Sequence, residues 1–523
     1  MIKNFKWLFL VSLTFVACSE DEDVVTYNSS DGLPLTAGTA DFSKYVALGN
    51  SLTAGYTDSA LFMEAQKISY PNILASQFAL VGGGEFKIPY MADNIGGLLL
   101  GGFQIQGPRL YYNGSGPAPV PGPPTTEVTN LLAGPFNNLG VPGAKSFHLL
   151  APGYGNVAGV PSGQSNPYYV RFASSSSSKI IDDATSQNPT FFSLWIGNND
   201  VLAYATSGGT GVNQLGNLNP ATYGGNDITD PAVFASTYNT LVNSLTTGSA
   251  KGVVANLPYV TSVPFFTTVP TNALPGLPPA NVTTLNQLFG GINAALAAAS
   301  LPPRFVTLVA DDGNPTTTET NPLLIVDESL PNIAPQITAA LTAPTGPYPA
   351  PTAAFIGNLY GRARHARNTP STNRDYILLT ARGVIGTNQA GAPAPFNVIG
   401  ISNPMQDGTT LTADETAQVK TATDAYNASI QSIATAKGLA FVDANAALAQ
   451  VANGGITANN FTVTSAYVIG GGFSMDGVHP SPRGYALIAN KFIEAINTKY
   501  GSNLKGVNLG NYRILYPLNP ASF

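Results

Sequence analysis

The sequence predicts an α/β fold, a doubly wound parallel sheet with helices on both faces, and two observations predict it. First, four short apolar runs each stop at a Gly, Pro or Asp residue, as strands buried on both faces do. Second, the segments between and after them repeat apolar residues at helical spacing, and such alternation is typical of parallel sheets. The four strands are expected at residues 44–48, 190–196, 253–257 and 439–442.

Three helices are expected from their start signals. Pro231 opens one, since proline favours the first turn of a helix. The run Thr412-Ala413-Asp414-Glu415 is a capping-box pattern ahead of a second, and Ser481-Pro482 provides an N-cap and a first-turn proline for the last. In each segment apolar residues recur on one helical face, so each helix is expected to pack against the sheet.

Length and composition limit the class of protein. The chain has 523 residues, of which 44% are hydrophobic and only 10% charged, against roughly 25% charged in an ordinary soluble domain. It can therefore bury a large core. The 23 basic residues are outnumbered by 29 acidic ones, and the net charge of −6 excludes a typical nucleic-acid-binding protein. The 54 Gly and 41 Pro residues indicate long ordered loops rather than a low-complexity chain.

Two segments interrupt the alternation of strands and helices. Residues 84–136 and 259–410 are rich in glycine and proline turns, and we expect both to be insertions into one α/β core that spans 41–500. The second insertion has a helical pattern of its own near 285–296, so a subdomain is expected there. Residues 501–523 are expected to form a C-terminal tail.

The N-terminus has the features of an export signal. Residues 1–17 combine lysines with an apolar run too short to span a bilayer, and Phe-Val-Ala-Cys at 15–18 resembles a bacterial lipobox. The resemblance implies a lipoprotein signal peptide that is cleaved before Cys18, whose sulfur then carries the lipid that anchors the protein in the outer membrane. Because Cys18 is the only cysteine, no intramolecular disulfide is expected.

An acidic linker is expected at residues 18–40, after the signal peptide. Its four consecutive acids at 20–23 lie in a segment without apolar periodicity, as in a solvated linker. The same acids resemble the surface-export signal of some lipoproteins, which would place the protein on the cell surface. Both interpretations stay open.

A serine stands at the end of the first predicted strand, in Gly49-Asn50-Ser51-Leu52. Open α/β sheets bind their ligands at the carboxyl ends of strands, so Ser51 is a candidate nucleophile, although a serine there could also simply cap the next helix. The block is not the nucleophile elbow of α/β-hydrolases. Thr53 occupies the position at which that motif requires glycine.

The chain has three histidines, and one of them follows a carboxylate at a useful spacing. Asp476 precedes His479 by three residues, so the acid can hold the Nδ1–H of the ring and leave Nε2 free as a base, although an aspartate that caps its own turn is the alternative. His148 lies among apolar residues and is expected in the core or near the wall of the site. His365 lies in the basic run 362–367 and is expected on the surface, either solvated or in contact with an anion.

Four blocks of the sequence, taken in order, resemble the SGNH (GDSL-type) hydrolase family. The one departure is Asn50, because the family has aspartate before its serine. The resemblance implies a three-layer, flavodoxin-like sheet with long loop insertions, and hydrolysis of carboxylic esters by a serine, as in lipases and esterases. The blocks are Gly49-Asn50-Ser51-Leu52, residues 138–144, Gly197-Asn198-Asn199-Asp200 and Asp476-Gly477-Val478-His479-Pro480.

The resemblance also implies roles for particular residues. Ser51 would be the nucleophile, His479 the base, and Asp476 the acid that orients the histidine. The backbone N–H groups of Ser51 and Gly143 and the side-chain amide of Asn199 would form the oxyanion hole, which binds the negative oxygen of the reacting carbonyl.

Three hypotheses about function stay open on the sequence alone. The first is a lipase or general carboxylester hydrolase, in which the apolar loop 96–103 could accept an acyl chain. The second is a carbohydrate O-acetyl esterase, favoured by the lipoprotein features and the 23 tyrosines. The third is a binding lipoprotein whose hydrolase core has lost activity, motivated by Asn50. Because the family's aspartate there is not the acid that orients the histidine, activity is expected to survive.

No cofactor and no metal ion is expected. The histidines are far apart and the cysteine has no partner, so carboxylates such as Asp311, Asp312 and Asp327 are the remaining candidates for calcium, and surface turns are the preferred interpretation. The glycine run 82–84 lacks the lysine of a phosphate-binding loop. The expected partners are an ester substrate, either an acyl lipid or an acylated glycan, and the membrane through the lipid on Cys18, but not nucleic acid.

Overall fold

The structure is a computed structural model that describes residues 32–314, 316–368 and 373–520. A five-stranded parallel sheet forms its centre. In chain order its strands lie in the spatial order 2-1-3-4-5, which is an order of doubly wound sheets. The first strand therefore has the second on one side and the third on the other. The strands are β1 (Tyr45–Gly49), β6 (Asn138–Gly140), β7 (Phe191–Trp195), β8 (Lys251–Ala255) and β15 (Ala440–Val442).

The four strands that the sequence predicts are those with mostly buried apolar runs. All residues of β1 and β7 are buried, as expected for strands covered on both faces, and the four predicted strands are present within two residues of their expected bounds. The edge strand β6 was not predicted. Its three residues, Asn-Leu-Gly, are too few and too polar to give an apolar run, although all three are buried.

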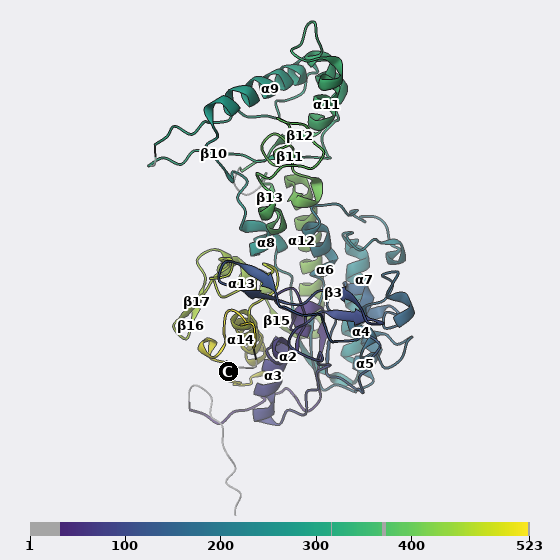
Figure 1. Ribbon diagram of the computed structural model, residues 1–523. Helices are drawn as coiled ribbons and strands as arrows, with labels where there is room; N and C mark the ends of the chain where they lie inside the picture. Colours follow the sequence, from purple (N-terminus) through teal and green to yellow (C-terminus); the bar gives the residue numbers. More distant parts are fainter. Residues whose placement is uncertain (1–31, 315, 369–372, 521–523) are drawn as a thin grey trace, which may run out of the picture.

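Helices cover both faces of the sheet, as Figure 1 shows. On one side α14 packs on α3, and Phe492 of α14 stacks on Tyr70 with ring centroids 4.6 Å apart. On the other side α12 packs on α7, where Tyr426 stacks on Phe234 at 4.2 Å. The α/β arrangement with a parallel sheet between helices is thus confirmed. These helices are α3 (Tyr70–Phe78), α5 (Ile180–Thr185), α7 (Pro231–Leu245), α12 (Ala413–Lys437) and α14 (Pro482–Tyr500).

The predicted start signals act as helix caps. Glu415 and Thr412 form the capping box of α12: the backbone N–H of Thr412 donates to Glu415 Oε2 at 2.7 Å, and the N–H of Glu415 donates to Thr412 Oγ1 at 3.5 Å. Ser481 Oγ accepts the N–H of Gly484 at the start of α14, at 3.1 Å.

The segment 84–136 contains two small antiparallel hairpins, and the second contacts the turn after α1, where the N–H of Leu110 donates to the carbonyl of Asp58. Leu98 packs in a small apolar cluster, but several apolar side chains of the hairpins are exposed, including Phe103 at 79%. Polar contacts hold them in place: Arg109, fully buried, donates to the carbonyls of Pro517 and Leu518 near the C-terminus. The strands are β2 (Leu98–Leu100), β3 (Phe103–Gln106), β4 (Leu110–Tyr112) and β5 (Pro117–Pro119).

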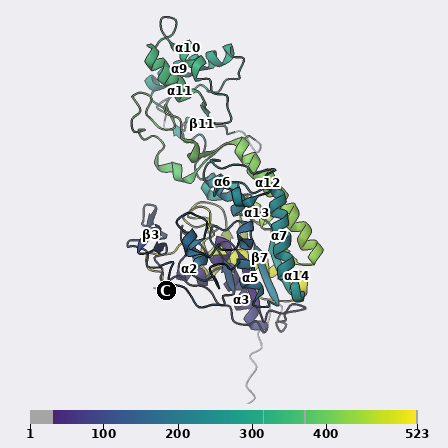
Figure 2. The ribbon, with the colours of Figure 1, turned by 90° about the vertical axis from the view of Figure 1, so that its right-hand side faces the viewer.

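The segment 259–410 contributes most of a separate lobe, which Figures 1 and 2 show above the sheet. The lobe has its own apolar core, in which residues such as Phe289, Ile337 and Tyr360 pack together. The long helix α12 leads from the lobe into the layer that covers the sheet (Figure 2). The lobe elements are α9 (Pro279–Ala298), α10 (Ala334–Leu341), α11 (Ala350–Tyr360) and the pairs β9 (Leu274–Pro275) with β10 (Thr320–Asn321), β11 (Leu324–Val326) with β12 (Ala363–His365), and β13 (Tyr376–Ile377) with β14 (Thr410–Leu411).

The middle of the basic run 362–367 is buried, so the expectation that His365 lies on the surface was wrong. Arg364 and His365 are both 5% exposed. Arg364 can be buried because two carboxylates neutralise it: its Nε donates to Asp327 at 2.6 Å, and its Nη1 and Nη2 donate to Asp375 at 2.5 and 2.8 Å. Asp375 also accepts the N–H of Ala413, so this ionic cluster joins the lobe to the start of α12.

Shorter elements complete the described chain. The segment after α14 packs on the core, with Leu509 and Tyr516 buried. Cys18 and the predicted export signal lie outside the described residues, among which no helix has the length and apolar character needed to cross a bilayer. The shorter elements are α1 (Ser51–Ala54), α2 (Met63–Lys67), α4 (Pro167–Val170), α6 (Asn199–Thr206), α8 (Pro264–Thr267), α13 (Ala444–Ala452), β16 (Ile456–Ala458) and β17 (Phe461–Val463).

Removal of the Asp375 carboxylate should strongly destabilise the protein. In Asp375→Ala, the buried Arg364 loses two of its three hydrogen bonds to carboxylates, and breaking one side of a buried ion pair costs about 3–5 kcal/mol. Urea denaturation measures the loss. The control is Asp424→Ala, which removes an exposed pair with Lys420 and should cost less than about 1 kcal/mol. Similar losses in the two variants would contradict a structural role for the cluster.

Candidate active site

The topology of the sheet brings three loops together at one edge. Parallel strands present their carboxyl ends on the same side, and β1 lies between β6 and β7. Ser51 follows β1 and begins α1, Gly143 follows β6, and Asn199 follows β7 and begins α6. Three of the four sequence blocks therefore meet although they lie far apart in the chain.

The fourth block completes a chain of hydrogen bonds with Ser51. Ser51 Oγ lies 3.0 Å from His479 Nε2, across 428 positions of sequence, and His479 Nδ1 lies 2.9 Å from Asp476 Oδ2. An ionised Asp476 accepts the Nδ1–H, so Nε2 carries no proton and accepts the hydroxyl of Ser51. Ser51 is 6% exposed and the His479 side chain 15%. The arrangement suits removal of the serine proton by the histidine.

The Asp476 carboxylate is held by four N–H groups. Its Oδ1 accepts the backbone N–H groups of Val478 and His479, each at 2.8 Å, and its Oδ2 accepts the N–H of Ser59 at 2.9 Å as well as the histidine ring. Burial alone would raise the pKa of Asp476, but the electrostatic attraction and N–H groups of His479 and the N–H of Ser59 outweigh it and lower the pKa to about 2. Asp476 is therefore ionised at neutral pH.

The N–H of Ser59 reaches Asp476 from an unusual turn. Asp58 and Ser59 have φ of 51° and 65°, the left-handed region that non-glycine residues seldom adopt, and Thr57 and Ala60 pair across them with two hydrogen bonds of 3.1 Å. The 1% exposed Asp58 carboxylate accepts the N–H of Met475 at 3.0 Å, which ties the turn to the loop ahead of Asp476. Burial raises the pKa of Asp58 to about 7.

Sequence reasoning missed this turn. An aspartate tolerates the left-handed conformation better than most residues, so Asp58 was a local signal for a turn. Nothing in the sequence indicates that the next N–H faces Asp476.

The insertion 259–410 also contacts the loop of the catalytic candidates, through α8, which packs in the main core. The carbonyl of Gly477 accepts the N–H of Phe265 in α8 at 2.9 Å. Gly477 has φ +74°, and a Cβ there would lie 2.9 Å from a methyl carbon of Leu379 and 3.0 Å from the N of Phe265. Glycine is required at this position because both the backbone conformation and the close approach of Leu379 and Phe265 exclude a side chain.

The candidate oxyanion donors lie in the loops after β6 and β7. Among the described residues, the backbone N–H groups of Ser51 and Gly143 have no hydrogen-bond acceptor, so both are available to a ligand. The Asn199 amide donates to the carbonyl of Ala144 at 2.9 Å, which fixes it beside the Gly143 loop. Fully buried Asp200 holds the same loop through the N–H and hydroxyl of Ser146, at 2.8 and 2.7 Å.

Asn50, the departure from the family pattern, makes contacts away from the histidine. Its Oδ1 accepts the N–H of Leu52 at 3.0 Å and caps α1, and its Nδ2 donates to Asn198 Oδ1 at 3.3 Å. The side chain is fully buried. It therefore supports the turn that presents Ser51 and takes no part in the chain from Ser51 to Asp476.

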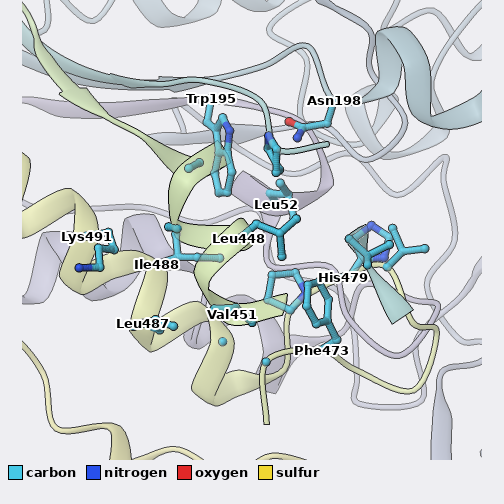
Figure 3. Close-up of a pocket in the computed structure, with 18 of the residues that line it drawn as sticks. Leu52, Trp195, Asn198, Leu448, Val451, Phe473, His479, Leu487, Ile488 and Lys491 are labelled. Carbon is cyan, nitrogen blue, oxygen red and sulfur yellow. The ribbon is translucent and has the colours of Figure 1, made fainter. Parts of the chain in front are cut away.

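An apolar cavity of about 130 Å³ opens beside Ser51 (Figure 3). Leu52, Trp195, Leu448 and Ile488 contribute to its walls. None of its lining residues belongs to 84–136, so loop 96–103, which could accept an acyl chain, does not line this cavity. Residues of α13 and α14, which follow β15, form much of the remaining wall.

The hairpins of 84–136 reach the site through polar contacts instead. Gln106 of β3 donates to the hydroxyl of Tyr56 at 2.5 Å and accepts the hydroxyl of Tyr168 at 2.8 Å. The ring of Tyr56 lies against that of His479, with centroids 4.6 Å apart. Tyr56 thus covers one side of the histidine, and β3 fixes its position.

The other candidate residues lie apart from this site. His148 stacks on Tyr154 at 4.4 Å and is half-buried, and the loss of solvation lowers its pKa to about 3. Asp311 and Asp312 lie on the surface near Glu319, and their carboxylates accept N–H groups of their own turns. Asp327 is not part of a surface turn, because it is buried against Arg364.

Comparisons with known proteins give no information about the function of this chain. No family model matches the chain, and searches of curated proteins and of solved structures find no match either. The function is therefore inferred from the residues described above.

The free energy of unfolding should depend on pH because the pKa of Asp476 is low in the folded protein. Its folded pKa of about 2 lies below the unfolded value of about 3.9, so the carboxylate stabilises the fold by about 2 kcal/mol at neutral pH, and this contribution is lost as the pH falls through 2. In Asp476→Asn, the free energy of unfolding should be lower at neutral pH and approach that of the wild type as the pH falls from about 4 to 2. A difference that stays constant over this range would contradict the assigned cause.

Proposed function

We propose that this protein is a serine-dependent carboxylic ester hydrolase of the SGNH type. The observation that carries the proposal is the chain of hydrogen bonds from Ser51 through His479 to Asp476, with distances of 3.0 and 2.9 Å. The order and identity of the four sequence blocks support it. The strand order 2-1-3-4-5 between two layers of helices is also what a three-layer, flavodoxin-like member of that family requires.

The first half of the proposed reaction forms an acyl-serine. Ser51 Oγ attacks the ester carbonyl carbon as its proton passes to His479 Nε2. The tetrahedral intermediate then breaks its bond to the alkoxy oxygen, which takes the proton from Nε2 and leaves as the alcohol. Asp476, ionised at neutral pH, stabilises the imidazolium that exists between the two proton transfers.

The second half returns the enzyme to its starting state. Water gives a proton to His479 Nε2 and its oxygen attacks the acyl carbon. The bond from that carbon to Ser51 Oγ breaks, Oγ takes the proton back, and the carboxylic acid leaves. No group outside the chain is needed, because each proton taken by the histidine is returned in the same half of the reaction.

Negative charge on the carbonyl oxygen would be stabilised in both halves by three donors. These are the free N–H groups of Ser51 and Gly143 and the amide of Asn199, which are fixed before substrate binds. Donors that need no reorganisation are effective, and losing one costs roughly 2.7–4 kcal/mol of barrier.

Two further hypotheses remain as competitors. A carbohydrate O-acetyl esterase would use the same residues on a glycan. The third hypothesis, a binding protein without activity, was based on Asn50. The side chain of Asn50 contacts Asn198 and Leu52 but neither His479 nor Asp476, so its contacts do not support a loss of activity.

We also propose that a lipid on Cys18 anchors the enzyme in the outer membrane. The support is the lipobox-like sequence at 15–18 and the acidic linker that follows it. One lipidated cysteine and a linker would leave the folded part free to reach substrates near the membrane surface.

Replacement of the nucleophile or base should abolish hydrolysis. Ser51→Ala and His479→Ala should each lower kcat for an aryl ester by about 10⁴-fold or more, because each removes a member of a unit that acts together. The control is Ser76→Ala, on the exposed side of α3, which should keep the wild-type rate. An organophosphate should add its mass to the wild type but not to Ser51→Ala. Unchanged rates in either variant would remove the assigned site.

Restoration of the family residue at position 50 should change activity only modestly. In Asn50→Asp the carboxylate still caps α1, and the amide of Asn198 can turn to donate to it. We expect kcat/KM for an aryl ester to stay within about tenfold of the wild type, or roughly 1.4 kcal/mol. Adding Asn198→Asp would place two carboxylates together and should lower activity further. A change from no activity to full activity in Asn50→Asp would show that position 50 decides catalysis.

A further inference from the structure

The cavity beside Ser51 is a channel. Its end at the catalytic candidates is polar, and the rest of its wall is apolar. Ser51, Asn198, Asn199 and His479 line one end. From there the cavity follows α14 from Gly484 towards Lys491, a path of about 10 Å at 1.5 Å per residue. Between the polar end and Lys491, every lining residue is apolar. Figure 3 shows Lys491 on the opposite side of the channel from His479.

The walls of the channel come from two helices and the sheet. Leu448 of α13 and Ile488 of α14 lie between the catalytic end and Lys491, with Leu52 above them (Figure 3). Leu448 and Ile488 are only partly buried by other residues, because they face this space. A narrow apolar space of about 130 Å³ favours a hydrocarbon chain over a sugar, whose hydroxyls would find no partners there.

Lys491 separates the channel from the surface. It lines both the channel and a second hollow on the outside of α14, which Lys499 and Glu494 also line. Its Nζ donates to Glu494 Oε2 at 2.9 Å, and the Glu494 side chain is 65% exposed. The ammonium group is thus held on the surface side, and the aliphatic stem of Lys491 forms the inner wall.

We propose that this channel binds the acyl chain of the ester substrate, and that Lys491 closes its far end and sets the longest chain that fits. The proposal rests on the ester hydrolase function proposed above, and it names the substrate class as esters of linear, medium-length fatty acyl groups.

The two-step reaction explains why the channel would hold the acyl group rather than the alcohol. After the first step the acyl group stays bound to Ser51 Oγ, and the alcohol must leave before water enters. An alcohol in a channel closed at its far end would be trapped behind the acyl-serine. An acyl chain in the channel leaves the side of His479 free for the alcohol to depart and for water to attack.

A series of aryl esters of increasing acyl length tests the channel in the full-length wild type. From acetate through butyrate to octanoate, kcat/KM should rise by roughly fourfold per added methylene, the fold-change that matches ~0.8 kcal/mol per buried CH₂. It should then fall for palmitate, which is longer than the channel. A preference for acetate, with no gain for longer chains, would overturn the proposal and favour the O-acetyl esterase.

Two variants locate the chain. Lys491→Ala opens the far end towards the outer hollow and should raise kcat/KM for palmitate relative to octanoate by roughly tenfold. The matched control is Lys499→Ala, which removes the same charge from α14 at an exposed position that does not line the channel, and should leave the series unchanged. Leu448→Phe narrows the channel and should lower the ratio of the octanoate rate to the acetate rate by roughly tenfold.

The outcomes separate this inference from the proposed function. Hydrolysis of acetate esters that depends on Ser51, together with a chain-length series that neither Lys491→Ala nor Leu448→Phe alters, would overturn the channel and leave the hydrolase in place. No Ser51-dependent hydrolysis of any ester would remove the hydrolase itself. Leu448→Phe could fail to fold and so lose the acetate reaction as well. The comparison of Lys491→Ala with Lys499→Ala then tests the channel, because both lysines lie at the surface and their replacement should leave the fold intact.

Discussion

The Asp476 carboxylate is the group on which the geometry of the site depends. A buried negative charge is costly unless it is compensated, and here the compensation comes from the adjacent residues 478–479 and from Ser59, 417 positions away. The turn at 57–60 and the loop at 474–479 are thereby fixed against each other. Since Ser51 begins the helix just before that turn, the same contacts set the separation of Ser51 Oγ and His479 Nε2. Two residues in a left-handed conformation persist because both segments hold them.

The sheet explains how so long a chain can still form so small a site. The loops that carry Ser51, Gly143 and Asn199 leave neighbouring parallel strands at the same edge, so their relative positions depend on strand pairing and not on the number of residues between them. The segments 84–136 and 259–410 interrupt the chain outside the strands. They could therefore grow without moving the three loops, and each supports the site from outside, the first through Tyr56 and the second through Gly477.

The sequence predicted the features that have a local signal. Four strands appear as apolar runs and three helices carry caps that the structure contains, so the α/β class followed from the sequence. The partners of Ser51 followed only from the resemblance, because no local pattern shows that residues 51 and 479 meet. Burial of Arg364 was missed because its two carboxylates are distant in sequence, and β6 because three residues give no periodicity. The apolar channel was missed because its walls combine residues from α13, α14 and the strand ends, which no single segment reveals.

The helix α12 has a consequence for any attempt to shorten this protein. It is about 37 Å long, begins on the ionic cluster of the lobe at Ala413, and ends against the sheet near β15. The lobe and the sheet are thus joined by one continuous helix, and α8, which packs in the main core, donates to the carbonyl of Gly477 between Asp476 and His479. Excision of 259–410 would remove Phe265, which supports the loop of Asp476 and His479, and Asp375, which accepts the first N–H of a core helix. A truncated version is therefore not expected to keep the geometry of this site.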